Sequence, residues 1–268
     1  MTKLSEYEQL GKVYRKQLFE KFLATKQGHP GSVFSMMDIA VVLYHGGFVR
    51  FDSNKKVFTD RVVISKGHAT ASLYPILKNF GVIPEEEWEN WGHGSSILRV
   101  FGNTSMPGID VTSGSLGHGV GVGAGMALAA KARGEDTRIF VVISEGELYE
   151  GSTWEGLLFA HHHKLDNLTI IVDVNNLIIL GGTDDCLKLN PIKDKIAGLG
   201  IDTIEVNGHD FEELSTSFKA NLDKSVLTCM VVNTVKGKGV SFMENKNNWH
   251  YFNPMTEGQI EQARKELS

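Results

Sequence analysis

The 268-residue sequence is poor in three features that would point to particular classes of protein. It has only two cysteines, Cys186 and Cys229, which lack a CxxC spacing, so neither a disulfide framework nor a thiolate metal site is expected. Acidic residues (32) outnumber basic ones (27), and the net charge of −5 argues against a nucleic-acid-binding surface. No run of about 18 apolar residues is present, so no membrane span is expected. The opening MTKLSEYEQLGKVYRK also lacks the apolar core of a secretory signal. These absences predict a cytoplasmic protein with two reduced thiols.

Glycine is abundant instead, with 29 residues that cluster between apolar runs. Short runs rich in Val, Ile and Leu alternate with helical patterns along the chain. Because continuous apolar runs are typical of parallel strands buried on both faces, we predict an α/β fold. It should contain a mostly parallel, twisted sheet with helices on both faces, in a single domain over residues 1–268. Strands are predicted at 61–64, 138–144, 168–174, 201–206 and 227–235, and helices at 3–26, 35–46, 69–80, 114–133, 151–163, 191–199 and 211–222.

The segment VVISEGELYEGSTWEG, at 141–156, ends an apolar strand in a group of carboxylates. Glu145 follows this strand directly, and Asn175 follows the next one. Ligands of parallel α/β sheets bind beyond the carboxyl ends of the strands. If the two strands are neighbours, Glu145, Asn175 and a backbone carbonyl form an oxygen set that suits Mg²⁺ or Ca²⁺, with phosphate and water as further ligands. Gly146 and the glycines of the segment 114–117 would let backbone amides approach a phosphate. A solvated acidic loop would give the same pattern.

The glycine-rich segment GVGVGAG, at 119–125, offers a competing interpretation. It overlaps the dinucleotide-binding pattern, and Glu145 lies about twenty residues further on, as that pattern requires. However, the pattern must follow a strand, and residues 106–114 are loop-like. The same glycines would allow close helix packing, so a dinucleotide site is disfavoured.

Six short motifs then follow one another in an order that is typical of one family. They are QGHPG (27–31), SKGHA (65–69), SGSLGHG (113–119), the segment 141–168, DVNN (173–176), and KGKG (236–239) with the later WH (249–250). Together they resemble the N-terminal, diphosphate-binding domain of transketolase, in the split form where this domain is a separate subunit. The resemblance extends over nearly the whole chain.

The resemblance implies thiamine diphosphate as the cofactor, held through a divalent cation, Mg²⁺ or alternatively Ca²⁺ or Mn²⁺. The implied metal ligands are Glu145, Asn175 and the carbonyl of Leu177. Further cofactor contacts are implied for His68, Gly114, Leu116, Ser144, Gly146, Glu150 and Asn175. The implied catalytic residues are His29, His68 and His250 near the reactive ring and the substrate, and Glu150 and Glu155 in a carboxylate network between two active sites of a dimer. Like charges are tolerated at close range when one member of such a network is protonated. Glu147 is expected to be an ordinary loop carboxylate.

The resemblance also implies that part of the active site is supplied by another chain. The acid that activates the pyrimidine ring, and the arginines that hold a sugar phosphate, belong to domains that this chain does not contain. We therefore expect a second subunit of about 300 residues with a pyrimidine-binding and a C-terminal domain, in an α₂β₂ assembly. The expected reaction is transfer of a two-carbon ketol unit between a ketose and an aldose, as free sugars or phosphates.

Three positions depart from the family pattern. Glu145 stands where an aspartate is usual, Asn103 where a histidine is usual, and Tyr251 where a glycine is usual. Asparagine cannot donate a proton as a histidinium can, and the longer carboxylate either shifts the cation or changes the metal preference. These departures leave two alternatives open, which are chemistry on a modified or nucleotide-linked sugar and a degenerate, non-catalytic partner subunit.

Overall fold

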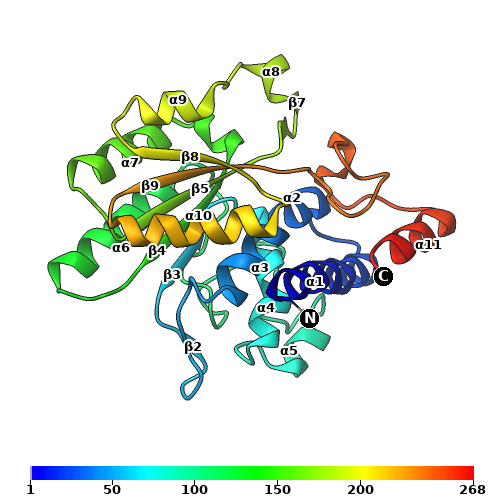
Figure 1. Ribbon diagram of the computed structural model, residues 1–268. Helices are drawn as coiled ribbons and strands as arrows, with labels where there is room; N and C mark the ends of the chain where they lie inside the picture. The colour runs from blue at the N-terminus through cyan, green and yellow to red at the C-terminus, as the bar shows by residue number, and fades with distance from the viewer. Residues whose placement is uncertain (1) are drawn as a thin grey trace.

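The computed structural model describes residues 2–268 and contains a five-stranded parallel sheet at its centre (Figure 1). The strand order is β3-β4-β5-β9-β8, and every neighbouring pair is parallel. These strands are β3 (Arg61–Ile64), β4 (Ile139–Ser144), β5 (Leu168–Val174), β8 (Asp202–Asn207) and β9 (Thr228–Asn233). The predicted class, a mostly parallel α/β sheet, is confirmed.

Helices cover both faces of this sheet, so successive side chains of one strand enter two different cores. Phe140 and Val142 of β4 join one hydrophobic cluster, whereas Val141 and Ile143 join a second cluster on the opposite face. The helices are α1 (Lys3–Thr25), α2 (Pro30–Ser35), α3 (Met37–His45), α4 (Tyr74–Asn79), α5 (Glu85–Glu89), α6 (Gly119–Ala132), α7 (Gly151–His162), α8 (Thr183–Cys186), α9 (Ile192–Ala197), α10 (Phe211–Lys224) and α11 (Glu257–Glu266). This double burial explains why the strand sequences are continuously apolar.

Three predicted helices differ from the structure in their bounds or type. The helix predicted over 69–80 is a 3₁₀ helix up to Leu73 and an α-helix, α4, only over Tyr74–Asn79. The helix predicted over 114–133 begins only at Gly119, because Gly117 has a φ of +84°, a left-handed conformation that a continuing helix cannot contain. The helix predicted over 35–46 begins earlier in the chain, at Pro30, and is divided at Met36 into α2 and α3. Proline at the first helical position explains the earlier start.

Short elements complete the chain. The 3₁₀ helices are η1 (Gly67–Leu73), η2 (Glu145–Tyr149) and η3 (Asn247–His250), and two small hairpins pair β1 (Phe51–Asp52) with β2 (Val57–Phe58) and β6 (Leu177–Ile178) with β7 (Gly181–Gly182). The C-terminal segment returns to the N-terminal helix, where Arg264 of α11 pairs with Glu20 of α1 at 2.7 Å (Figure 1). No helix within residues 2–268 has the length and apolar character needed to cross a bilayer.

Candidate active site

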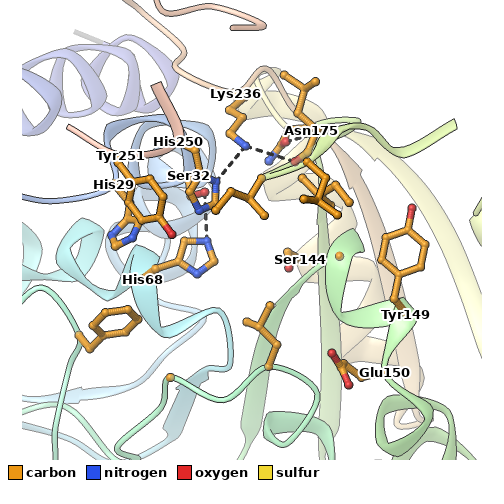
Figure 2. Close-up of a pocket in the computed structure, with 18 residues that line it drawn as sticks. His29, Ser32, His68, Ser144, Tyr149, Glu150, Asn175, Lys236, His250 and Tyr251 are labelled. Atoms are coloured by element: carbon orange, nitrogen blue, oxygen red, sulfur yellow. Dashed lines mark hydrogen bonds between the residues drawn. The ribbon is translucent and has the colours of Figure 1, made fainter. Parts of the chain in front are cut away.

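A pocket of about 350 Å³ opens at the carboxyl ends of β4 and β5 (Figure 2). The strand register pairs Ser144 with Asp173, so the chain leaves both strands at the same edge of the sheet. The predicted site residues that line the pocket are His29, His68, Gly114, Leu116, Ser144, Gly146, Glu150, Asn175, Leu177 and His250. The lining also contains residues that were not predicted, namely Ser32, Phe101, Tyr149, Ile178, Ile179, Leu180, Lys236 and Tyr251.

The three predicted metal ligands form one connected group. The Glu145 carboxylate accepts hydrogen bonds from the backbone N–H of Asn175 at 3.2 Å and of Leu177 at 3.1 Å. The Asn175 Oδ1 accepts from the same Leu177 N–H at 3.3 Å. Glu145 is 1% exposed and lies beneath the pocket lining, whereas Asn175 and Leu177 face the pocket. Burial and the nearby Asp173 carboxylate raise the pKa of Glu145 to about 7.

A buried ion pair lies at the same edge of the sheet and was not predicted. Lys66 and Asp173 have fully buried side chains and pair with each other. Asp173 also accepts hydrogen bonds from Ser35 Oγ, at 2.7 Å, and from Thr234 Oγ1. Because removal of one partner would leave a buried charge uncompensated, this pair fixes the strand ends relative to η1 and α2. Lys66 and Asp173 were visible in the motifs, but their pairing joins residues that are 107 positions apart.

A second lysine enters the pocket from the loop after β9. The Nζ of Lys236 donates to the Leu177 carbonyl at 3.3 Å and lies 3.2 Å from His250 Nδ1 (Figure 2). The residue is only 1% exposed. Burial lowers the pKa of Lys236 to about 8, and the carboxylates of Glu145 and Asp173 act in the opposite direction. The side chain therefore remains mainly protonated at pH 7.

The three predicted histidines form a triangle at the other side of the pocket. Ring centroids are 5.2 Å apart for His29 and His68, 5.5 Å for His29 and His250, and 5.4 Å for His68 and His250. The Nε2 of His68 lies 3.1 Å from Ser32 Oγ. The Nδ1 of His29 is buried and has no hydrogen-bond partner within the described residues. Since a buried polar nitrogen normally has a partner, this atom is suited to a ligand in the pocket.

All three imidazoles are held neutral. Burial and the nearby charge of Lys236 lower the pKa of His29 to about 4 and that of His250 to about 4. Burial, followed by the charge of Lys66, lowers the pKa of His68 well below its usual range. At neutral pH these rings are therefore hydrogen-bonding groups without charge.

The expectation for Glu147 was wrong. This carboxylate is fully buried and accepts hydrogen bonds from the backbone N–H of Gly117 at 2.9 Å and of Ser144 at 3.0 Å, and from the hydroxyl of Ser65. It therefore joins the loop before α6, the end of β4 and the loop after β3. A sequence of alternating acids and glycines gives no indication of which carboxylate points inward.

Gly114 and the two acids of the predicted carboxylate network, Glu150 and Glu155, differ in their position relative to the pocket. At Gly114 a Cβ would have only Phe101 nearby, at 3.8 Å, so this wall of the pocket is open to a ligand. Glu150 lines the pocket at the start of α7, whereas Glu155 is exposed on α7 and does not line it. The role of these two acids in a carboxylate network between two active sites stays a prediction.

The two other departures from the family pattern differ in their relation to the pocket. The Tyr251 ring lies 4.9 Å from His29 and contributes to the pocket wall. Asn103 does not line the pocket, and its Oδ1 accepts from the Ser105 N–H at 3.0 Å. Asn103 therefore stabilises its own loop, whereas Tyr251 narrows the side of the pocket at which the histidines lie.

The fold and the pocket define an α/β protein of the class that binds its ligand beyond the carboxyl ends of parallel strands. Comparison with known proteins assigns the family. A family model described as "Transketolase, thiamine diphosphate binding domain" matches residues 12–268. The chain therefore belongs to the transketolase family and corresponds to its thiamine diphosphate-binding domain, as the motifs predicted.

Similar proteins are found among separate subunits and among longer chains. The chain is 37% identical to a subunit of the apulose-4-phosphate transketolase of Phocaeicola vulgatus, over 95% of this chain and 91% of that protein. It is 33% identical to human transketolase, over 91% of this chain but 39% of that protein. The transketolase structure from Campylobacter jejuni superposes with a TM-score of 0.87 at 27% identity, covering 98% of this chain and 43% of that one. This chain thus spans about two fifths of the full-length enzymes.

The residues of the pocket fit the cofactor and cation of this family. One carboxylate, one amide oxygen and one backbone carbonyl are hard donors of the kind that Mg²⁺ and Ca²⁺ prefer. Within residues 2–268, no three His, Cys, Asp or Glu side chains are grouped so as to hold a metal by themselves. A cation at Glu145, Asn175 and Leu177 would therefore need further oxygens, which a diphosphate would supply.

Proposed function

We propose that this chain is the diphosphate-binding subunit of a split transketolase, in which it binds thiamine diphosphate and Mg²⁺. The reaction is transfer of a two-carbon ketol unit between a ketose and an aldose, with sugar phosphates as the first substrates to test. One observation carries the proposal: Asn175 and Leu177 line the same pocket as the histidine triangle, and the Glu145 carboxylate accepts hydrogen bonds from their backbone directly beneath. The match to 91% of a relative named as a separate subunit supports the split form.

The residues divide into two roles. Glu145, Asn175 Oδ1 and the Leu177 carbonyl would hold the cation, and Gly114, Leu116, Ser144 and Gly146 would form the wall against the cofactor. The bound cofactor would supply the electron sink for carbon–carbon bond cleavage.

The neutral imidazoles of His29, His68 and His250 would accept or donate hydrogen bonds at the substrate hydroxyls. Because they are neutral, each ring offers one donor and one acceptor nitrogen to these hydroxyls. The unpartnered Nδ1 of His29 supports this role.

The pocket alone is not a complete transketolase site. Its lining residues in the described chain include no arginine that could hold a sugar phosphate. We propose a second subunit of about 300 residues, made of a pyrimidine-binding and a C-terminal domain. It would supply the missing acid and the arginines in an α₂β₂ complex. A cytoplasmic location remains part of this proposal, based on the two free thiols.

The names of the relatives and the position of Tyr251 indicate which substrates to test first. Two similar proteins are named for apulose 4-phosphate, at 37% and 34% identity. This ketose phosphate is therefore the first donor to assay, followed by the ketose phosphates of ordinary transketolase substrates. Activity only with a modified or nucleotide-linked sugar would instead support the alternative, which the aromatic wall at Tyr251 favours.

A native mass spectrum of the complex purified from its own source tests the proposal. A four-chain assembly that carries two thiamine diphosphates and two divalent cations is expected. A bare chain, or a complex that stays free of cofactor after addition of thiamine diphosphate and Mg²⁺, would support the non-catalytic alternative. Ketol transfer by the purified chain alone at enzymatic rates would exclude the split form.

The role of Glu155 in the carboxylate network has its own test. We expect Glu155→Gln to leave the binding of thiamine diphosphate intact but to slow activation of the cofactor in the assembled complex. The measurement is proton exchange at the reactive carbon of the cofactor together with steady-state activity. Unchanged values of both would remove Glu155 from the mechanism.

A further inference from the structure

Tyr251 places an aromatic ring at the opening of the pocket, next to two of the three pocket histidines. Its ring centroid lies 4.9 Å from that of His29 and 4.8 Å from that of His250. Tyr251 lines the pocket and is nevertheless 51% exposed, so it stands where the pocket meets solvent. Figure 2 shows it on the histidine side, opposite Tyr149 and Glu150. Any part of a substrate that extends from the histidines toward solvent therefore runs alongside this ring.

A second aromatic residue narrows the same opening. The Phe101 ring lies 5.6 Å from that of His29, and Phe101 also lines the pocket while remaining 42% exposed. His29, with a ring on either side, is itself buried. At about 350 Å³ the pocket is near the lower end of the range for small-molecule sites, and the proposed cofactor must occupy part of it. Little room is left beside the histidines for a substrate chain.

The backbone on both sides of Tyr251 is anchored, so the ring is held near the opening. The N–H of Phe252 donates to the Gly28 carbonyl at 2.9 Å. On the other side Trp249 is buried and its ring centroid lies 5.4 Å from that of Phe242. Tyr251 itself has an extended backbone, with φ −104° and ψ 161°, which any residue can adopt. A substitution at this position therefore changes the opening of the pocket without straining the chain.

We propose that Tyr251 determines substrate specificity by limiting the length of the sugar chain beyond the transferred two-carbon unit, so that short ketose phosphates are preferred as donors. The inference rests on the ketol transfer given under the proposed function. Exclusion at a narrow opening increases with the length of the chain that must fit there. The histidines, in contrast, are proposed to contact substrate hydroxyls, which all ketose donors carry. Tyr251 should therefore discriminate between donors, whereas the histidines should act on all of them alike.

The test uses the complex purified with its partner subunit and measures kcat/KM for pentulose, hexulose and heptulose phosphates with one aldose acceptor. In the wild type kcat/KM should fall as the donor becomes longer. Tyr251→Gly should raise the ratio of the heptulose value to the pentulose value by about tenfold, because the opening widens. Tyr251→Phe is the matched control, since it keeps the ring and should keep the ratio of the wild type.

Tyr251→Ala carries the same expectation as Tyr251→Gly and replaces it if glycine loosens this segment. An unchanged ratio in an active complex would overturn the inference and leave the proposed function intact. The same change in Tyr251→Phe would assign the discrimination to the hydroxyl and would also overturn the inference.

A nucleotide-linked donor gives the opposite expectation, because its base would stack on the ring. Activity with such a donor that is lost in Tyr251→Gly but kept in Tyr251→Phe would show that the ring binds substrate rather than excludes it, and would overturn the inference. If the wild-type complex transfers a ketol unit from no ketose phosphate, the proposed function fails and the inference fails with it.

Discussion

Glu145 and Glu147 are two residues apart and both are buried, yet their surroundings differ. Glu145 accepts hydrogen bonds from the backbone of Asn175 and Leu177 beneath the pocket, where we propose that it binds the cation. Glu147 points the other way and accepts three hydrogen bonds from Gly117, Ser144 and Ser65. Glu147 thus holds together the loops that shape the pocket, whereas Glu145 is the proposed metal ligand.

We expect Glu147→Gln to destabilise the chain by about 2–3 kcal/mol, because hydrogen bonds to a charged acceptor are strong and the amide group would face two backbone donors. Urea unfolding followed by circular dichroism gives the free energy of unfolding. Glu86→Gln, at an exposed position of α5, is the matched control and should change it by less than about 0.5 kcal/mol. Equal values for the two variants would show that Glu147 is not a structural acid.

Single residues of the site were predictable from sequence only where they come directly after a strand or belong to a motif. Glu145 and Asn175 follow neighbouring strands, so their proximity could be inferred once the strands were placed. Other contacts of the site join residues that are far apart in the sequence. Lys66 pairs with Asp173, 107 positions away, and Lys236 donates to Leu177, 59 positions away. Glu147 accepts from Gly117, 30 positions away. Such pairings depend on how loops pack in three dimensions, and no local pattern encodes them.

At the scale of elements, the glycines of α6 divide into two kinds. A Cβ on Gly123 would lie 2.2 Å from Val141 Cγ2 of β4, whereas a Cβ on Gly125 would have nothing within 4 Å. The absence of a side chain at Gly123 therefore allows α6 to pack closely on β4. The dinucleotide interpretation, which was already disfavoured, has no strand directly before this helix within residues 2–268.

This division gives a paired prediction for helix packing. Gly123→Ala should destabilise the chain by about 1–3 kcal/mol, because the added methyl group overpacks the contact between α6 and β4. Gly125→Ala should stabilise it by up to about 1 kcal/mol, because alanine favours the helix and the site is open. Thermal and urea unfolding of both variants provide the measurement. A loss of similar size in both variants would contradict the packing argument.

The elements themselves were largely predictable. Strands of continuous Val, Ile and Leu, such as 168–174, show their class because both sheet faces are buried. The hairpin of β6 and β7 and the helix η3 were not predicted, although both border the pocket. These segments are short, and tertiary contacts rather than periodicity determine them.

At the scale of the whole molecule, the pocket depends on segments from both ends of the chain. His29 comes from the start of α2, His68 from η1 and His250 from η3, and their rings meet only in the complete fold. In the unfolded chain each imidazole is free to take up a proton near its ordinary pKa of about 6.5. In the folded chain burial and nearby lysines prevent this, so the unfolded state binds more protons as the pH falls.

The stability of the chain should therefore decrease as the pH is lowered from about 6.5 toward 4. A folded pKa of about 4 for His29 and His250 means that this loss continues until the pH falls through that value. At pH 5 each of these two histidines should contribute roughly 1–2 kcal/mol to the loss. Urea unfolding of the metal-free chain at several pH values measures the slope, and His29→Asn should reduce it. His93→Asn, at an exposed loop, is the matched control. An unchanged slope in His29→Asn would mean that His29 takes up a proton equally well in the folded and unfolded chains, so that the fold does not lower its pKa.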